Sequence, residues 1–370
     1  MKESKNSYSH ILKYTGLFGS VEFLSILIGL VRNKCVAVLL GPQGMGLISL
    51  FNSTITLVSS TTNLGIPTSA VRDISEAYES GDSKRLHSLI SVIRSWSLLT
   101  GIVGMLLCVA ISPLLSRFTF SYGEHTFHFV CLSPIIALMA ITGGETAILK
   151  GTRHLKRLAT ISIYNVIGAL LTSVPIYYYF GNRGIVPSMF VIALLQMILI
   201  IALSYSLFPL NFSFGKQNLS KGISMVRLGI AFVLAGILGS GADFVIRSYF
   251  NYNASEEILG LYNAGYMMTM VYAGMVFSAM ETDFFPRLSA VNNDLAERNA
   301  TVNRQIEVSV LLISPLLVLF SIGMPIILPL LYSYKFLPAV EMMQITVLAM
   351  YVRAVKLPVA YISLSRGDSK

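Results

Sequence analysis

Long apolar stretches, separated by short polar segments, run through almost the whole sequence. A bilayer core about 30 Å thick requires roughly 20 consecutive, mostly apolar residues in a helix. Ten stretches of this kind are bounded by charges, glycine or proline, and they favour an all-α polytopic membrane protein. The predicted membrane-spanning helices are residues 14–40, 45–70, 88–115, 129–149, 159–180, 184–208, 224–248, 258–284, 305–331 and 337–363.

The composition agrees with this interpretation. Hydrophobic residues make up 54% of the 370 residues and charged residues only 12%, whereas a soluble globular domain carries roughly 25% charge. The mean hydropathy of +0.69 likewise excludes an ordinary soluble enzyme. The three cysteines, Cys35, Cys108 and Cys131, lie in apolar stretches without CxxC or Cys/His spacing, which indicates neither a disulfide framework nor a zinc site.

The basic residues are distributed unevenly between the two sides of the predicted membrane. The loops after odd-numbered helices hold only Arg117, Arg183, Arg247 and Lys335, whereas the N-terminus and the other loops hold 19 Lys and Arg residues. Because cytoplasmic loops carry the excess of Lys and Arg, both termini of this chain are predicted to be cytoplasmic. The net charge of +9 is therefore an orientation signal, and no nucleic-acid partner is expected.

The sequence also resembles itself at an offset of about 215 residues. This offset aligns Gly46-Leu47 with Gly260-Leu261, Arg32 with Arg247, Arg72 with Arg287, and Gly151 with Gly367. A repeat of this kind predicts two parallel helix bundles, an N-terminal lobe of six helices over residues 1–210 and a C-terminal lobe over 211–370. The second lobe then has four of its six expected helices. We therefore expect it to be incomplete, with the last two of twelve helices lying beyond residue 370.

Several charged and polar residues lie inside the predicted helices. A charge at the bilayer centre costs around 2.5 to 3.5 kcal/mol on insertion scales, so one that persists usually faces a bundle interior or a water-filled cavity. We expect such residues to border a crevice between the lobes and to bind an anionic substrate. The candidates for substrate binding are Arg32, Lys34, Asn52, Asn63, Arg247, Arg353 and Lys356.

Three carboxylates, Glu22, Glu145 and Asp243, are candidates for coupling transport to a proton or cation. For several of these residues a purely structural role stays open as an alternative. Asp243 precedes Arg247 by four residues, so the two can pair within one helical turn. Lys34 and Arg247 are near enough to the outer interface to extend toward it. The polar face of the second helix suits helix packing as well as hydrogen bonding to cargo.

The usual catalytic motifs are missing from the sequence. It contains no P-loop, no HExxH and no Ser-centred nucleophile motif, and the outer loops are too short to carry an acid, a base and a donor site. We therefore expect neither an enzyme nor a cofactor. His125 and His128 lie three residues apart, a spacing that is compatible with an adventitious metal contact but more often has no functional meaning. Ser83 or Asp82 is expected to cap the helix that leads into the third span.

Five phrases of the sequence carry a resemblance to a known family. On them, the chain from its N-terminus to about residue 368 resembles the Wzx-type polysaccharide flippases of the multidrug/oligosaccharidyl-lipid/polysaccharide exporter superfamily. It departs from their pattern in having ten helices where they have twelve. The phrases are AVLLGPQGMGLISLF (37–51), GIPTSAVRDISEA (65–77), GDSKRL (81–86), ILKGTRHLKRLA (148–159) and FFPRLSA (284–290).

The resemblance implies a two-lobed transporter that moves an oligosaccharide linked to undecaprenyl pyrophosphate from the cytoplasmic to the outer leaflet by alternating access, with proton or ion coupling. It implies a cationic central cavity, with which Arg32, Lys34 and Arg353 agree. It also implies a place among the lipids of the bacterial cytoplasmic (inner) membrane. The implied partners are a polysaccharide polymerase and a chain-length regulator, in the biosynthesis of a surface polysaccharide such as the O-antigen of lipopolysaccharide, capsule or exopolysaccharide.

Residues and resemblance together predict a flippase for lipid-linked oligosaccharides, with the lipid tail between the lobes. One alternative is a drug or cation antiporter of the same fold, in which Glu22, Glu145 and Asp243 would dominate and the cations would be dispensable. A second alternative is a membrane partner of glycan synthesis enzymes that does not itself transport.

Overall fold

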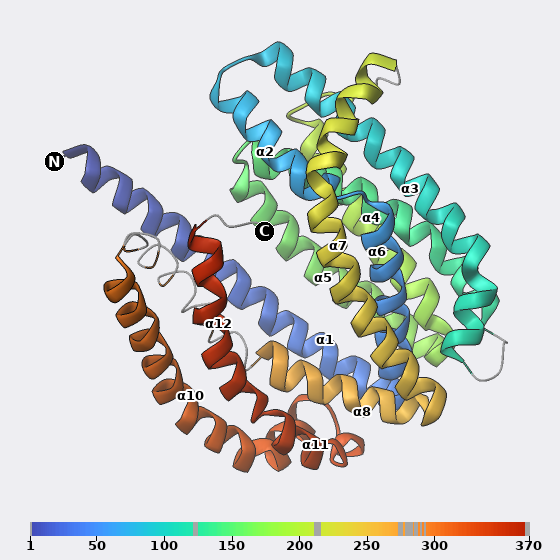
Figure 1. Cartoon of the computed structure of the whole chain (residues 1–370). Coiled ribbons are helices and arrows are strands. Elements are labelled where there is room, and N and C mark those ends of the chain that lie inside the picture. Colours follow the sequence, from blue (N-terminus) through green and yellow to red (C-terminus); the bar gives the residue numbers. More distant parts are fainter. Residues whose placement is uncertain are drawn as a thin grey trace. The chain divides into compact units, whose positions relative to one another are not determined.

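The computed structural model describes residues 2–120, 125–210, 216–272 and 294–366, together with residues 277, 284, 288 and 291. Within these ranges it leaves the side chains of residues 2–23, 216–221, 224–232, 235, 272 and 363–366 undescribed. All regular structure in the described residues is helical, and no strand occurs among them (Figure 1). The predicted all-α class is confirmed.

The helices follow one another with short connections. The first part of the chain contains α1 (Lys2–Thr62), α2 (Ile66–Glu79), α3 (Ser83–Thr119), α4 (Thr126–Gly151), α5 (Leu155–Phe180), the 3₁₀ turn η1 (Gly181–Gly184), α6 (Ile185–Tyr205) and α7 (Lys216–Asn253). The second part contains α8 (Glu256–Tyr266), the π-helical η2 (Met267–Tyr272), α10 (Leu295–Leu331), the 3₁₀ turn η3 (Tyr334–Phe336), α11 (Ala339–Thr346) and α12 (Ala349–Arg366).

Six helical segments in the described part of the chain are long and apolar enough to cross a membrane. Two of them are long enough to cross the membrane twice. Leu24–Thr62 covers most of the first and second predicted spans, and Leu155–Tyr205 covers most of the fifth and sixth. The predicted span 258–284 lies partly outside the described residues. The six segments are Leu24–Thr62, Ser83–Thr119, Thr126–Gly151, Leu155–Tyr205, Leu295–Leu331 and Ala339–Ile362.

The turn between the first two predicted spans is built into α1. Gly41 has φ 66° and ψ −169°, and Pro42 follows it. A positive φ is strained for a residue with a Cβ but open to glycine, and proline interrupts the helical hydrogen-bond ladder. The pair Gly41-Pro42 therefore separates the two halves of α1, as the predicted boundary between residues 40 and 45 requires.

The second predicted span, residues 45–70, is corrected at its end. The helix stops at Thr62 and α2 begins at Ile66, because Leu64 and Gly65 adopt positive φ values of 52° and 70°. The side-chain oxygen of Asn63 accepts a hydrogen bond from the Gly65 backbone N–H at 2.9 Å. Such local side-chain bonding competes with the helical ladder, and the hydrophobic pattern alone contains no signal for it.

A compact core holds α2 against α3 and α4. The amphipathic helix α2 buries residues at helical spacing on one face. Asp82 caps the next helix, because its carboxylate accepts a hydrogen bond from the Arg85 N–H at 2.9 Å. Of the two caps predicted, Asp82 is thus the one the structure uses. The buried core residues are Ile66, Ala70, Ile74, Ala77, Leu86, Ile90, Ile93, Ala147 and Ile148.

The chain forms two compact units, Met1–Glu256 and Glu257–Lys370. The repeat in the sequence places the boundary between the lobes near residue 210 and assigns α7 to the second lobe. In the structure α7 belongs to the first compact unit. The reason is packing, since α7 contacts α1, α2 and α3. Its Asn251 side chain also donates a hydrogen bond to the Thr119 carbonyl at 2.9 Å.

Candidate functional site

A buried ion pair in the first unit joins Arg94 of α3 to Glu145 of α4. Arg94 Nε donates to Glu145 Oε1 at 2.7 Å, and Arg94 Nη2 donates to Oε2 at 3.2 Å. Ser204 Oγ donates to Oε2 at 2.5 Å. Both charged side chains are only 2% exposed. Glu145 thus accepts three hydrogen bonds inside the first unit, and a role in ion coupling requires it to exchange Arg94 for a proton or cation.

The same arginine holds the end of α6. Arg94 Nη1 donates to the Pro209 carbonyl at 2.9 Å, and Nη2 donates to the Phe208 carbonyl at 3.0 Å. Its guanidinium lies 4.3 Å from the ring centroid of Tyr205, a cation–π distance. One side chain therefore ties the end of α6 to both α3 and α4.

Arg94 was not recognised from the sequence as a functional or structural centre. It was counted among the 19 basic residues of the cytoplasmic side, although position 94 falls inside the predicted span 88–115. Two signals point to it in retrospect. It follows Ile90 and Ile93 on the face of α3 that enters the core. An opposite charge, Glu145, lies near the matching end of the next helix. Spacing alone does not tell which of several nearby cations Glu145 binds.

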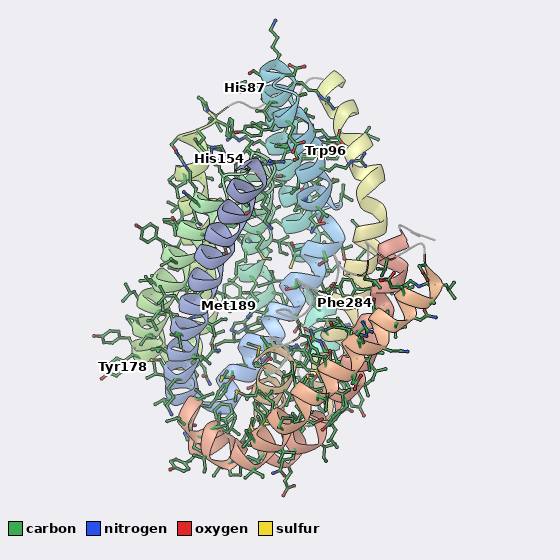
Figure 2. All side chains as sticks on the ribbon, turned by 90° about the vertical axis from the view of Figure 1, so that its left-hand side faces the viewer. His87, Trp96, His154, Tyr178, Met189 and Phe284 are labelled. Carbon is green, nitrogen blue, oxygen red and sulfur yellow. The ribbon has the colours of Figure 1, made fainter. Side chains whose placement is uncertain are left out.

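A small aromatic and imidazole cluster lies at this end of the first unit. Phe208 contacts the rings of His87 and His154 edge-on, at centroid distances of 6.3 and 6.2 Å. His87, His154 and Trp96 lie near one end of the unit, and Tyr178 lies toward the other (Figure 2). This end carries the basic loops that the charge distribution assigns to the cytoplasm.

Acidification is expected to destabilise this cluster through His154, which lies between α4 and α5. Burial lowers the pKa of His154 below its usual 6.5, Arg157 lowers it further, and a hydrogen bond with Thr152 opposes the shift. The unfolded chain therefore binds the proton more readily, so this stability is present above pH 6.5 and is lost as the pH falls from there. Thermal unfolding at pH 7 and pH 5.5 checks this: the loss on acidification should be smaller in His154→Gln than in the wild type.

Arg32 connects the first half of α1 to α5. Its Nε donates a hydrogen bond to Ser173 Oγ at 3.1 Å, and both residues lie well inside their apolar helices. Ser173 in turn donates to the Ala169 carbonyl at 2.5 Å. Arg32 is half-buried. The predicted deep cation is therefore in contact with a hydroxyl of a neighbouring helix, in the first unit.

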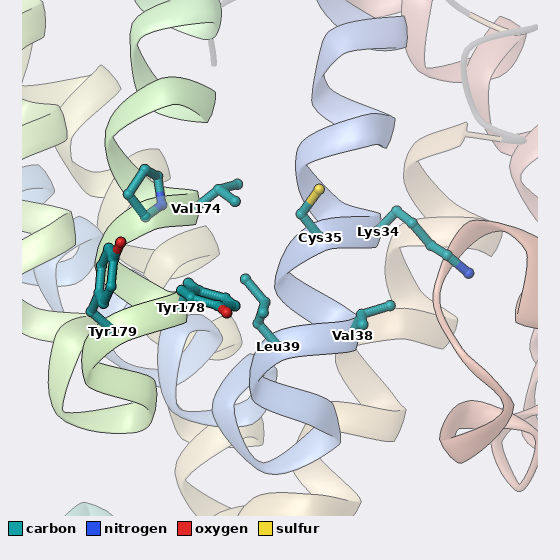
Figure 3. A pocket seen from close by; sticks show the side chains of 8 residues that line it. Lys34, Cys35, Val38, Leu39, Val174, Tyr178 and Tyr179 are labelled. Atoms are coloured by element: carbon teal, nitrogen blue, oxygen red, sulfur yellow. The ribbon is translucent and has the colours of Figure 1, made fainter.

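Lys34 borders a cavity of about 500 Å³ between α1 and α5 (Figure 3). Its stem lines the cavity, and its Nζ extends away from Tyr178 and Tyr179. Lys34 thus lines this cavity, whereas Arg32, two residues earlier on α1, is not among the lining residues. The other lining residues are Cys35, Val38, Leu39, Val174, Pro175, Tyr178 and Tyr179.

The two asparagines predicted to bind substrate have different surroundings. Asn52 is exposed on α1, one helical turn before the exposed Thr56. Asn63 uses its side-chain oxygen to form the break between α1 and α2. Further along the polar face, Ser60 lies beside Gly236 of α7, where a Cβ added to the glycine would be 3.9 Å from the Ser60 Cβ. This end of the polar face packs on a helix, and the Asn52 end is open.

Asp243 and Arg247 of α7 form the ion pair that their spacing suggested. Arg247 Nε donates to Asp243 Oδ2 at 2.8 Å. The Arg247 side chain is buried, whereas the Asp243 side chain is 37% exposed. The predicted pairing is confirmed, and the carboxylate keeps an accessible side.

The second unit contains Arg353 and Lys356 of α12. Arg353 Nη1 donates to the Met270 carbonyl at 3.1 Å, and its guanidinium lies 5.4 Å from the Phe277 ring centroid. Met270 belongs to π-helical η2, a geometry that is rare and frequent at functional sites. Lys356 is exposed. Arg353 is half-buried and binds an irregular stretch of backbone.

The helix that carries these cations is itself interrupted. The predicted span 337–363 consists of α11 and α12, with a turn at Val347 and Leu348 between them. Discontinuous helices in transporters leave backbone groups that line cavities and bind ions. In the second unit, the π-helix, this turn and Arg353 lie in elements that contact one another.

Some predicted features lie outside the described side chains or fit no site. The side chain of Glu22 is among those not described. Within the described residues, no group of three His, Cys, Asp or Glu side chains is placed to hold a metal ion. The His125 and His128 rings lie 5.0 Å apart and stack with Phe120 and Phe51, respectively.

Comparisons with known proteins agree with the helical transporter architecture. A family model described as "Polysaccharide biosynthesis protein" matches residues 35–341. No curated protein shows significant sequence similarity to the chain.

Three solved structures illustrate the structural similarity. An inward-facing multidrug resistance MATE family transporter of the MOP superfamily has a TM-score of 0.72 and 16% identity, over 92% of this chain and 80% of that one. An outward-facing MATE transporter of the same superfamily has a TM-score of 0.63 and 16% identity, over 94% and 79%. A MOP superfamily transporter from Pyrococcus furiosus, whose binding pocket is described as having reverse polarity, has a TM-score of 0.62 and 14% identity, over 94% and 80%. At these identities the similarity establishes the two-lobed exporter fold, which confirms the predicted architecture.

Proposed function

Because the chain belongs to the polysaccharide biosynthesis protein family and has the fold of the MOP-superfamily transporters, we propose that it is a flippase for lipid-linked oligosaccharides. The cargo is an oligosaccharide on undecaprenyl pyrophosphate, which the protein moves by alternating access from the cytoplasmic to the outer leaflet of the bacterial inner membrane. The chain is then a multi-pass protein with both termini in the cytoplasm. It works beside a polymerase and a chain-length regulator, in the synthesis of O-antigen, capsule or exopolysaccharide.

The observation that carries this proposal is the deep pair of cations Arg32 and Lys34 on α1. Both lie inside a membrane-spanning segment. A charge in such a place is expensive unless it serves a ligand, a partner or a water-filled path. Arg32 donates one N–H to Ser173, and its guanidinium has several further N–H donors that suit a phosphate.

The other predicted residues take supporting parts in this proposal. Arg353 and Lys356 supply positive charge within the second unit, and the exposed Asn52 of the first unit offers hydrogen bonds to sugar hydroxyls. Arg247 and Asn63 support the site through the ion pair and the helix break that they form. The proposed coupling residues are Glu22, Glu145 and Asp243.

Neutralising the deep cations tests the proposal. Arg32→Gln and Arg353→Gln are each expected to lower surface glycan display about tenfold or more, since a charge-assisted hydrogen bond contributes about 1.5–3 kcal/mol. Arg32→Lys and Arg353→Lys should recover part of it. Surface glycan is measured in a deletion strain complemented with each variant, at equal protein abundance in the membrane. The matched control is Arg304→Gln, an exposed arginine of α10, which should leave display unchanged.

Two other results would replace this function with another. If Asp243→Asn abolished dye or drug export while Arg32→Gln and Arg353→Gln had no effect on glycan display, the protein would be an antiporter. If the purified chain failed to move lipid-linked oligosaccharide in vesicles, yet deletion removed the glycan, it would be a non-transporting partner of the synthesis enzymes.

A further inference from the structure

Ser173 lies on the buried face of α5 and contacts a charged side chain of another helix. The residues buried at one-turn spacing in this part of α5 are Ala169, Ser173 and Tyr177, and Ser173 is 0% exposed. Arg32 of α1 reaches this face, because its Nε donates to Ser173 Oγ at 3.1 Å. The bond therefore fixes the Arg32 side chain against the interior face of a neighbouring helix in the first unit.

The hydroxyl of Ser173 can accept a hydrogen bond from Arg32 but has no proton left for a ligand. Its Oγ–H donates to the Ala169 carbonyl, one turn earlier on α5, at 2.5 Å. A serine hydroxyl has one proton and two lone pairs, so this bond commits the proton to α5 and leaves a lone pair for Arg32 Nε. Ser173 is thus unsuited to bind an anion directly, and any part that it takes in anion binding acts through Arg32.

The bond to Ser173 leaves the outer edge of the Arg32 guanidinium available. A guanidinium has five N–H donors in a planar fork, one on Nε and four on the two Nη atoms. Nε is held by Ser173, and in the part of the chain that the structure describes Arg32 has no ion-pair partner. The side chain is also only half-buried. Arg32 therefore keeps the Nη edge, which can bind a phosphate through two parallel hydrogen bonds.

We propose that Ser173 is a positioning residue for Arg32, which holds the guanidinium at Nε so that its Nη edge meets the phosphate of the cargo. The benefit is preorganisation. An arginine side chain has many rotamers, and ordering it when a ligand binds weakens the binding unless another contact has already ordered it. This inference rests on the proposed function and adds to it the residue that orients the phosphate-binding group.

Binding of undecaprenyl pyrophosphate to the purified full chain, measured by native mass spectrometry, tests the assignment. Ser173→Ala should raise the half-saturating concentration about two- to tenfold, the cost of ordering one long side chain. The matched control is Ser133→Ala on α4, which should leave binding unchanged. Ser133 is 3% exposed, and its Oγ donates to the Val130 carbonyl of its own helix at 2.8 Å.

Two variants of equal shape remove any effect of side-chain size. Ser173→Thr keeps the hydroxyl, which in threonine also bonds the carbonyl one turn earlier and leaves a lone pair for Nε. Ser173→Val has the same shape without the hydroxyl. Ser173→Thr should bind undecaprenyl pyrophosphate more tightly than Ser173→Val, again by about two- to tenfold. Equal binding by the two overturns the proposal.

A double-variant cycle separates positioning from packing. Where Arg32 is already replaced by glutamine, Ser173→Ala should cause no further loss of binding, because no guanidinium remains to be positioned. A role of Ser173 in packing alone predicts the same loss with and without Arg32. Equal losses in the two backgrounds, or wild-type binding by Ser173→Ala, overturn the proposal.

The outcome for Ser173 separates from the outcome for the proposed function. If Arg32→Gln lowers glycan display while Ser173→Ala binds undecaprenyl pyrophosphate like the wild type, the positioning role is wrong and the flippase function stands. If the wild type does not bind undecaprenyl pyrophosphate and deletion of the protein leaves the glycan intact, both fall.

Discussion

Replacing Arg94 by methionine is expected to lower the free energy of unfolding by about 3–5 kcal/mol, because the change leaves the carboxylate of Glu145 buried without its counter-charge. The pair is 2% exposed on both sides and bonded through two parallel hydrogen bonds. The change also removes the donors to the Phe208 and Pro209 carbonyls at the end of α6. Thermal and denaturant unfolding of the purified protein give the measurement, and Trp96, the single tryptophan, packs on the same core cluster as Phe208 and reports locally.

An exposed ion pair provides the control for this prediction. Arg72 and Glu76 lie 3.0 Å apart, with side chains 67% and 50% exposed. Arg72→Met should change stability by less than about 1 kcal/mol, since exposed pairs contribute little. A double variant, Arg94→Met with Glu145→Leu, should lose less than the two single changes added together, because no unpaired charge then remains inside. If Arg94→Met proves as stable as Arg72→Met, the buried pair of Arg94 and Glu145 does not hold α3, α4 and the end of α6 together.

Introducing leucine at Gly101 is expected to destabilise the first unit by about 1–3 kcal/mol or more, because it overpacks the contact between α3 and α4. A Cβ at this position would lie 3.1 Å from the Cα and 3.2 Å from the carbonyl oxygen of Ala137. Those atoms belong to the backbone of α4, so a change of rotamer cannot relieve the clash. The two helices have to move apart along a contact on which the α2–α4 core depends.

Gly239→Leu is the matched control for this second prediction. A Cβ at Gly239 of α7 meets nothing within 4 Å, so the same substitution has open space there. Its replacement by leucine should be neutral or slightly stabilising, since glycine is a poor helix former. The melting temperature and the membrane abundance of both variants decide the matter. Equal stability of the two would mean that α3 and α4 do not pack as closely as the structure places them.

The sequence predicted the helical class and most of the spans because hydropathy is a property of each segment by itself. It also offered two local features that the structure contains: Asp82 as one of two possible caps of α3, and a pairing of Asp243 with Arg247 as an open alternative. Both depend on residues three or four positions apart. The break at Asn63 was not predicted, although it too is local, because it depends on a side chain bonding its own backbone within an otherwise apolar run.

The candidate site was predicted as a set of residue types, and their partners were not. Arg32 was expected to be deep and polar in its surroundings, but its contact with Ser173 joins residues 141 positions apart. Arg94 was counted only as a cation of the cytoplasmic side, and its partner Glu145 lies 51 positions away on the next helix. The resemblance to polysaccharide flippases added the substrate class, which composition and spacing alone do not contain.

The sequence by itself determined that this chain is a helical membrane protein, where its spans lie, and which charges have to be accommodated among apolar residues. Only the tertiary structure decided which of those charges form buried ion pairs, as Arg94 does with Glu145, and which border a cavity, as Lys34 does. The physical reason is that burial in the membrane follows from the apolarity of a local segment, whereas the partner of a buried charge depends on which helices face each other.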